Sequence, residues 1–288
     1  MSSADDFFKR VAIIGAGLIG GSWGLALKKA GFRGVRAGCD RKDVLERALR
    51  AGAIDEGEED LRRAVAGAGL VILAAPVGEI LRILPELKKA LPHSALVTDV
   101  GSTKTVICRA ARENFGGNPL FLGGHPLAGK EKSGIAHASP EIFDGAAYIL
   151  TPDPPGAMSD RRVAAFCALV KAIGGRPVQL DAEAHDKIMA SLSHLPQLVS
   201  TALASLTEEN HALPVDLAAS GFRDVTRLAS SPYGIWRDIC LSNEQNIRIA
   251  LDSLIAKLES VRDRLSDSEL KREFVQAQRL RRRLEKLK

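Results

Sequence analysis

A single histidine stands in a setting suited to acid–base chemistry, within residues 123–131, Gly-Gly-His-Pro-Leu-Ala-Gly-Lys-Glu. It follows the apolar run 120–122, which we expect to form a strand. The unperturbed pKa of imidazole, about 6.5, lets a histidine accept a proton near neutral pH. We therefore take His125 as the candidate catalytic base. A histidine in a loop is also often a surface or capping residue, so the assignment depends on the surrounding chain.

A glycine-rich turn near the N-terminus has the form of a dinucleotide-binding motif, with an apolar strand at 11–14 before it and a helical stretch over 21–30 after it. The first glycine permits the tight turn, the second lets the backbone approach a pyrophosphate, and the third lets helix and strand pack closely. The N-terminus of the helix then offers free N–H groups to the phosphates. The residues of this turn are Gly15, Gly17, Leu18, Ile19 and Gly20.

An acidic residue, Asp40, follows a second expected strand over 35–39 and lies about 20 residues after the last glycine of the turn. That spacing is typical of the carboxylate that bonds the ribose of NAD, and its charge would repel the 2′-phosphate of NADP. Arg41 and Lys42 stand beside it, and an arginine here can accept that phosphate. We predict NAD as the cofactor and keep NADP as an alternative.

Strands and helices alternate as far as residue 180, which predicts an α/β fold with a parallel sheet and helices on both faces. Ligands in such sheets gather at the carboxyl ends of the strands. Asp40, Ala75-Pro76, Ser102 and His125 all fall at that edge, and we expect Ser102 to cap a helix over 103–114. The other expected strands are 70–74, 95–99, 148–151 and 177–180, and the other helices are 44–51, 59–66, 80–91 and 159–173.

The strand signals stop near Asp181, and helical patterns continue to the end of the chain. We therefore divide the chain into a Rossmann-type dinucleotide-binding domain over 1–181 and an all-helical domain over 182–288. The expected helices of the second domain are 182–206, interrupted by Pro196, then 217–228, 235–258 and a basic amphipathic 268–288.

The net charge of +5 does not indicate a nucleic-acid partner, because the basic excess lies in residues 271–288, most simply a solvated helix face. Four cysteines lack any metal-ligand spacing, so we expect reduced thiols and no metal site. The N-terminus lacks the basic region of a signal peptide, and residues 11–27 are too short and glycine-rich for a membrane span. We predict a cytoplasmic protein without a membrane partner.

Several motifs occur in a fixed order over residues 10–255, and together they closely resemble the prephenate/arogenate dehydrogenase family of tyrosine biosynthesis. The resemblance implies a Rossmann domain followed by a helical domain through which two subunits form a homodimer. It also implies oxidative decarboxylation of prephenate or arogenate, with hydride passed to a nicotinamide. Beyond the glycine turn the motifs are Asp99–Lys104, His125–Gly134, His185-Asp186, Ser193–Pro196, Phe222–Arg227 and Trp236–Ile239.

The resemblance also implies roles for single residues. His125 would take the proton of the ring hydroxyl, Ser102 would bond that hydroxyl and orient the histidine, and Arg227 would hold a substrate carboxylate. Glu131 and Trp236 match positions that line the family's pocket, although packing or solvation would also explain them. The motif histidines His185 and His194 are expected near the site. His194 is a candidate substrate contact, and both histidines can be structural, binding helices together.

Two positions depart from the family's pattern. Lys130 stands where a small hydroxyl residue, usually Thr, is expected, and Gln197 stands where many members have a second histidine. Both should lie near the substrate's side chain, which is a pyruvyl group in prephenate and an amino acid in arogenate. A lysine favours the purely anionic side chain, so we predict prephenate dehydrogenase activity and keep arogenate as the alternative substrate.

Two other functions are compatible with the layout. A β-hydroxyacid dehydrogenase has the same two-domain build, but it relies on a lysine in a glycine-rich helix of the second domain, and no such motif follows residue 181. A non-catalytic NAD-binding regulator would use the basic C-terminal helix to bind a partner. Turnover of prephenate with NAD separates both from the main prediction.

Overall fold

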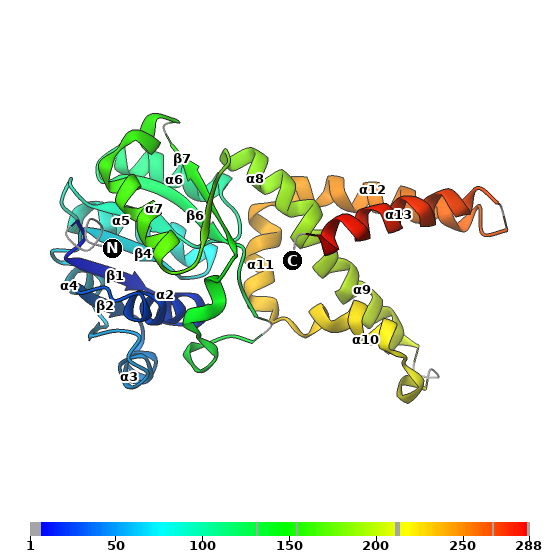
Figure 1. Ribbon diagram of the computed structural model, residues 1–288, viewed down its shortest axis with the longest axis horizontal. Helices are drawn as coiled ribbons and strands as arrows, with labels where there is room; N and C mark the ends of the chain where they lie inside the picture. Colours follow the sequence, from blue (N-terminus) through cyan, green and yellow to red (C-terminus); the bar gives the residue numbers. More distant parts are fainter. Residues whose placement is uncertain (1–6, 131, 154, 211–213, 267, 287–288) are drawn as a thin grey trace.

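An eight-stranded sheet organises residues 10–179 of this computed structural model, which describes residues 7–130, 132–153, 155–210, 214–266 and 268–286. The strand order is β3-β2-β1-β4-β5-β6-β7-β8 (Figure 1), and all neighbours pair in parallel except β6 with β7. The predicted α/β fold is therefore confirmed, with the last two strands reversed. The strands are β1 (Arg10–Ile14), β2 (Val35–Cys39), β3 (Glu56–Glu58), β4 (Leu70–Leu73), β5 (Leu96–Asp99), β6 (Leu120–Pro126), β7 (Ala147–Pro152) and β8 (Arg176–Gln179).

The central strands are apolar on both sides because helices cover both faces of the sheet. In β1, Val11 and Ile13 pack into the cluster formed with α2 (Leu18–Lys29) and α7 (Arg161–Ala172). The alternate residues, Ala12 and Ile14, pack into the opposite cluster. The helices of that second face are α4 (Leu61–Val65), α5 (Val77–Ala90) and α6 (Thr105–Phe115), while α3 (Lys42–Arg50) lies beside the edge strand β3.

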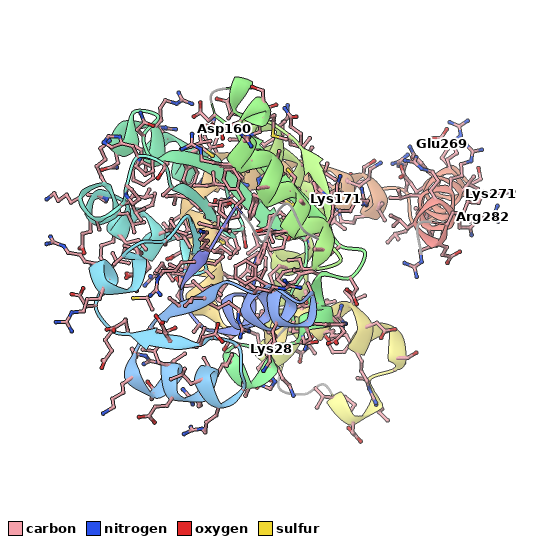
Figure 2. All side chains as sticks on the ribbon, turned by 60° about the vertical axis from the view of Figure 1, so that its left-hand side comes forward. Lys28, Asp160, Lys171, Glu269, Lys271 and Arg282 are labelled. Atoms are coloured by element: carbon pink, nitrogen blue, oxygen red, sulfur yellow. The ribbon has the colours of Figure 1, made fainter. Side chains whose placement is uncertain are left out.

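The chain beyond β8 is helical and extends away from the sheet (Figure 1). The end of the helix over 244–262 and the beginning of the helix over 270–285 lie farthest from the sheet (Figure 1), and Lys257 of the first forms an ion pair with Glu273 of the second at 3.0 Å. Figure 2 shows Lys271 and Arg282 on the final helix, well separated from the sheet. The helices are α8 (Ala182–Met189), the π-helix η4 (Ala190–His194), α9 (Leu195–Glu209), α10 (Ser220–Thr226), α11 (Tyr233–Ser242), α12 (Glu244–Arg262) and α13 (Leu270–Glu285).

Three expectations about local structure were wrong. His125 does not follow a strand, because β6 continues to Pro126 and pairs His125 with Ile149 of the antiparallel strand β7. Ser102 does not cap α6, which begins at Thr105, two residues later than that cap would require. The expected helix 235–258 is two helices separated at Asn243. In each case, contacts with residues far along the chain decide the boundary.

Carboxylates from the helical part of the chain hold the two parts together. The Asp186 carboxylate on α8 accepts hydrogen bonds from the backbone N–H of Lys104 and of Thr105, at 2.7 and 2.9 Å. The Asp238 carboxylate on α11 accepts one from the N–H of Gly78 at 2.9 Å. Each carboxylate thereby satisfies free N–H groups at the start of a sheet-domain helix, where a negative charge is stabilised. In the part of the chain that the structure describes, no helix is long and apolar enough to cross a membrane.

Candidate active site

A cleft of about 630 Å³ lies at the carboxyl edge of the sheet, where the glycine-rich turn joins β1 to α2. Gly15 has a φ of +95°, and a Cβ there would come within 2.4 Å of the carbonyl oxygen of Ala74. A Cβ on Gly17 would meet nothing within 4 Å, so the backbone at the start of α2 is open to a ligand. These features fit a bound pyrophosphate at the helix N-terminus. Ala75 and Pro76 also line this cleft, as the sequence predicts.

The carboxylate of Asp40 lies at the side of the same cleft, held in place by the backbone. Its oxygens accept hydrogen bonds from the N–H of Ala16 at 2.8 Å and of Arg41 at 2.7 Å. Each carboxylate oxygen keeps a lone pair that can accept a further bond from a ribose hydroxyl. The side chain of Arg41 is exposed and lies 3.8 Å from the carboxylate of Asp43. The geometry therefore fits an unphosphorylated ribose better than a 2′-phosphate.

A second cleft, of about 500 Å³, lies between the sheet domain and the helical part of the chain. His125, Ser102 and Lys130 line it from the first, and Trp236 lines it from the second. Leu18 and Ile19, at the start of α2, line the same cleft, whereas Gly15 and Gly17 line the nucleotide cleft. A dinucleotide lying across the start of α2 would therefore place its far end beside His125.

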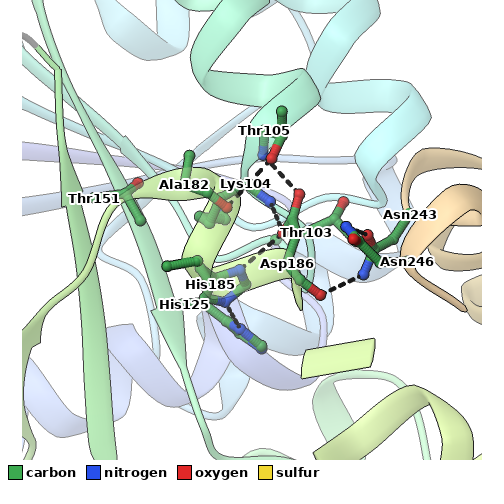
Figure 3. Close-up of polar contacts among 12 residues, drawn as sticks. Thr103, Lys104, Thr105, His125, Thr151, Ala182, His185, Asp186, Asn243 and Asn246 are labelled. Carbon is green, nitrogen blue, oxygen red and sulfur yellow. Dashed lines mark hydrogen bonds and ion pairs between the residues drawn. The ribbon is translucent and has the colours of Figure 1, made fainter. Parts of the chain in front are cut away.

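His125 is connected to two buried residues of α8 (Figure 3). Its Nδ1 lies 2.8 Å from Nε2 of His185, and Nδ1 of His185 lies 2.8 Å from a carboxylate oxygen of Asp186. His185 and Asp186 are both buried, whereas His125 is only partly buried and reaches the cleft. Within the described part of the chain, no hydrogen bond joins Ser102 to His125, so it is His185 that orients the ring.

The surroundings of His125 favour its neutral form. Burial lowers the pKa of His125 well below 6.5, and the positive charge of Lys104 adds to the effect. The unperturbed value of about 6.5 assumed from the sequence is therefore wrong, and the imidazole is uncharged at neutral pH. Burial alone would raise the pKa of Asp186, but hydrogen bonds from His185, Thr105 and Lys104 outweigh that effect and lower it. The cluster thus pairs an uncharged base with a buried carboxylate.

A fully buried ion pair supports the strand that carries His125. Lys104 Nζ contacts the carboxylate of Asp99 and donates a hydrogen bond to the carbonyl oxygen of Gly124 at 2.8 Å. The same carboxylate accepts hydrogen bonds from the N–H of Gly101 at 2.8 Å and of Gly124 at 3.0 Å. Both charges are therefore surrounded by hydrogen-bonding partners, as burial of an ion pair requires.

The remaining motif histidine, His194, is buried beside Trp236, with ring centroids 6.0 Å apart. Asn243 Nδ2 lies 3.2 Å from its Nδ1, which makes Nδ1 the acceptor and leaves the proton on Nε2. That Nε2 is buried and has no hydrogen-bond partner in the described structure. Burial lowers the pKa of His194 to about 4, so this ring is also neutral.

Besides His194, two predicted substrate contacts lie outside the lining of the second cleft. Gln197 is buried and donates a hydrogen bond to the carbonyl oxygen of Leu228 at 2.8 Å, which ties α9 to the turn over 227–230. Arg227 begins that turn and is exposed. Lys130 lies at the rim, where its Nζ donates to the carbonyl oxygen of His137 at 2.9 Å. Glu131 falls outside the described residues, and the roles of all four stay predictions.

The residues that hold His125 in place were underestimated from the sequence. From the sequence, His185 is expected to hold helices together, and Asp186 has no predicted role. A signal was present in the sequence, because a His-Asp dipeptide stands near the beginning of a helix and no apolar pattern of that helix explains the two polar side chains. Its distance of 60 residues from His125 gave no indication of contact.

Fold and clefts together have the layout of a two-domain dehydrogenase, with the nucleotide cleft beside the cleft that His125 lines. The family model "Prephenate dehydrogenase, nucleotide-binding domain" matches residues 23–179, and "Prephenate dehydrogenase, dimerization domain" matches residues 181–280. The chain belongs to the prephenate dehydrogenase family, as its motifs predict.

Individual relatives agree with the family assignment. The chain is 38% identical to a prephenate dehydrogenase of Bacillus subtilis over 259 residues, 88% of this chain and 69% of the relative. A crystal structure of the A. aeolicus prephenate dehydrogenase with hydroxyphenyl propionate and NAD+ is 30% identical, with a TM-score of 0.88 over 96% of this chain and 98% of the other. The Synechocystis arogenate dehydrogenase structure is 28% identical, with a TM-score of 0.80 over 96% and 99%.

Proposed function

We propose that this protein is an NAD-dependent prephenate dehydrogenase, which converts prephenate to 4-hydroxyphenylpyruvate by oxidative decarboxylation in tyrosine biosynthesis. The observation that carries the proposal is a neutral, partly buried His125 in a cleft that meets the nucleotide cleft at the start of α2. The family assignment and the 38% identical relative support the reaction type. We further propose that the protein acts in the cytoplasm.

The reaction requires orientation more than covalent catalysis, because forming an aromatic ring drives it. NAD, when bound, supplies the hydride acceptor. His125 accepts the proton of the ring hydroxyl at Nε2, so the O–H electrons form the new carbonyl as hydride leaves that carbon. Loss of CO₂ from the ring carboxylate then returns its electron pair to the ring and onto the carbonyl oxygen, which takes up a proton to become the phenol hydroxyl. Ser102, which lines the same cleft, bonds the hydroxyl. Arg227, exposed at the start of the turn over 227–230, is assigned to the ring carboxylate on the family resemblance.

Arogenate is the second candidate substrate, favoured by the likeness to the Synechocystis arogenate dehydrogenase. Lys130 at the cleft rim favours prephenate, because its ammonium would repel the amino group of arogenate. Measuring kcat/KM for prephenate and arogenate, each with NAD and NADP, tests the proposal directly. We expect the highest value for prephenate with NAD, and no turnover with any of the four pairs would refute the function.

The cofactor preference should depend on Asp40. In Asp40→Ser the negative charge is lost and a hydroxyl remains, so kcat/KM with NADP should rise and the preference for NAD should narrow or reverse. The measurement is kcat/KM for both cofactors at saturating prephenate, with Asp43→Ser as the control for an exposed acid nearby. If the parent protein already prefers NADP, the assignment of Asp40 is wrong and Arg41 becomes the residue to test.

Removal of Arg227 should weaken substrate binding more than the chemical step. A guanidinium grips a carboxylate through two parallel hydrogen bonds, but the ring carboxylate loses its charge as CO₂ departs. The contact is therefore strongest before reaction. A hydrogen bond to a charged group contributes roughly 1.5–3 kcal/mol, so Arg227→Ala should raise KM about 10- to 200-fold.

Steady-state kinetics of Arg227→Ala at saturating NAD check this expectation. Arg227→Lys should recover part of the affinity, and Arg248→Ala, on the exposed side of α12, is the control. A large fall in kcat with KM unchanged would instead mean that the contact forms only in the transition state.

We also propose a homodimer formed through the helices after residue 181. The matched dimerization model covers 181–280, and large apolar side chains are exposed there, among them Ile255, Leu258 and Phe274. Light scattering should therefore give the mass of two chains. Leu258→Asp should shift the mass toward one chain, whereas Leu49→Asp, at an exposed leucine of the sheet domain, should not. A monomer at every concentration would contradict the proposal.

A further inference from the structure

We propose that His185 and Asp186 are positioning residues that fix the tautomer of His125, so that its unprotonated nitrogen, Nε2, faces the substrate cleft. The inference rests on the proposed function for its catalytic meaning. The tautomer itself is a property of the free protein and can be measured without any substrate.

The buried carboxylate of Asp186 determines which nitrogen of His185 carries a proton. Asp186 is ionised at neutral pH, because hydrogen bonds from His185, Thr105 and Lys104 lower its pKa despite its burial. Its Oδ1 lies 2.8 Å from His185 Nδ1. Two acceptors cannot share so short a contact, so Nδ1 of His185 carries a proton and donates it to Asp186.

The proton on His185 in turn determines which nitrogen of His125 carries a proton. A neutral histidine with a proton on Nδ1 has a lone pair on Nε2, so Nε2 of His185 accepts a hydrogen bond. The group 2.8 Å away is Nδ1 of His125, which must therefore carry the proton of that ring. Nε2 of His125 is left with its lone pair, and no residue in the described structure bonds to it. Because Nδ1 faces the buried His185, Nε2 is the nitrogen on the side of the cleft.

The carboxylate is itself held rigidly at the junction of the two domains. Asp186 caps α6 through the N–H groups of Lys104 and Thr105, and its backbone oxygen accepts a hydrogen bond from Asn243 at 2.8 Å. Contacts from α6, α8 and the start of α12 therefore fix its position. The same contacts make the orientation of His125 depend on correct docking of the helical domain, which also supplies Trp236 to the cleft.

The charged and titratable groups around His125 are consistent with this assignment. Lys104 lies on the sheet side, and its positive charge disfavours a second proton on the ring. Asp99 is occupied by Lys104 and by two backbone N–H groups, so it does not compete for His125 Nδ1. Asp186 thus acts on His125 through His185 alone.

Nitrogen-15 NMR of the histidine rings tests the inference directly. In the parent protein, His125 should show a protonated Nδ1 and an unprotonated Nε2 at neutral pH. In His185→Leu the acceptor is lost, and the Nε2–H form of His125 should become populated. His185→Gln keeps an acceptor oxygen and should restore part of the original state. His93→Leu, at an exposed histidine, is the control and should leave His125 unchanged.

Kinetics give the functional readout. The kcat of His185→Leu should fall about 10-fold or more, without exceeding the loss in His125→Asn, because only part of the general-base contribution is removed. KM should change little, because the residues that line the substrate cleft are untouched. His185→Gln should recover part of the kcat.

The outcomes are distinct. An unchanged His125 tautomer in a folded His185→Leu overturns the inference, whatever the substrate proves to be. If the tautomer changes as expected but neither prephenate nor arogenate is turned over, the positioning role stands and the proposed function fails. A fall in kcat that the thermal unfolding midpoint fully accounts for, with no recovery in His185→Gln, would mean that His185 is only structural.

Discussion

His125→Asn should lower kcat by about 10²–10⁴ while the protein stays folded, because general acid–base catalysis contributes a factor of that size. Asparagine keeps a side chain that can hydrogen-bond the substrate hydroxyl, but it cannot accept the proton. KM should therefore change much less than kcat. The strand should persist, since the pairing of β6 with β7 uses the backbone of residue 125.

The pH dependence of the parent provides a second test of the same residue. Only the neutral imidazole can act as the base, and burial lowers the pKa of His125 well below 6.5. The acid limb of the kcat/KM profile should therefore lie below pH 6.5, and activity should persist under mildly acidic conditions. His93→Asn serves as the matched control at an exposed site. Near-normal turnover in His125→Asn would remove this residue from the mechanism.

Lys104→Met should destabilise the fold by about 3–5 kcal/mol, because breaking a buried ion pair leaves one charge uncompensated. Neither Lys104 nor Asp99 is accessible to solvent, so water cannot replace the lost partner. Denaturant unfolding of the cofactor-free protein measures this difference. Arg112→Met, which breaks the exposed ion pair with Asp153, is the control and should leave the unfolding midpoint nearly unchanged.

The same substitution should also affect the base. Lys104 helps to keep the pKa of His125 low, so Lys104→Met should move the acid limb of the kcat/KM profile toward pH 6.5.

In the double variant Asp99→Asn/Lys104→Met the uncompensated charge is gone, and the loss of stability should be smaller than the sum of the two single losses. If Lys104→Met unfolds with the same free energy as the parent, the pair of Lys104 and Asp99 is not buried in solution.

Local sequence determined the nucleotide site. The glycine turn, the strand before it, the helix after it and Asp40 are defined by short-range patterns, because each needs only its neighbours along the chain to adopt its conformation. The apolar runs of the central strands likewise predicted the sheet. The family resemblance depended on the order of longer motifs, and it supplied His125, Ser102 and Trp236, which one cleft brings together.

The tertiary structure decided how the base is held. β6 extends through His125 because an antiparallel neighbour supplies hydrogen bonds to the strand, which no pattern within residues 120–126 specifies. The cap of α6 comes from Asp186, more than 80 residues away, in place of Ser102. The low pKa of His125 likewise arises from burial and from charges on other elements. Such contacts form only when separate elements pack, so the sequence proposed His125 as the base while the fold determined the orientation and the protonation state of this histidine.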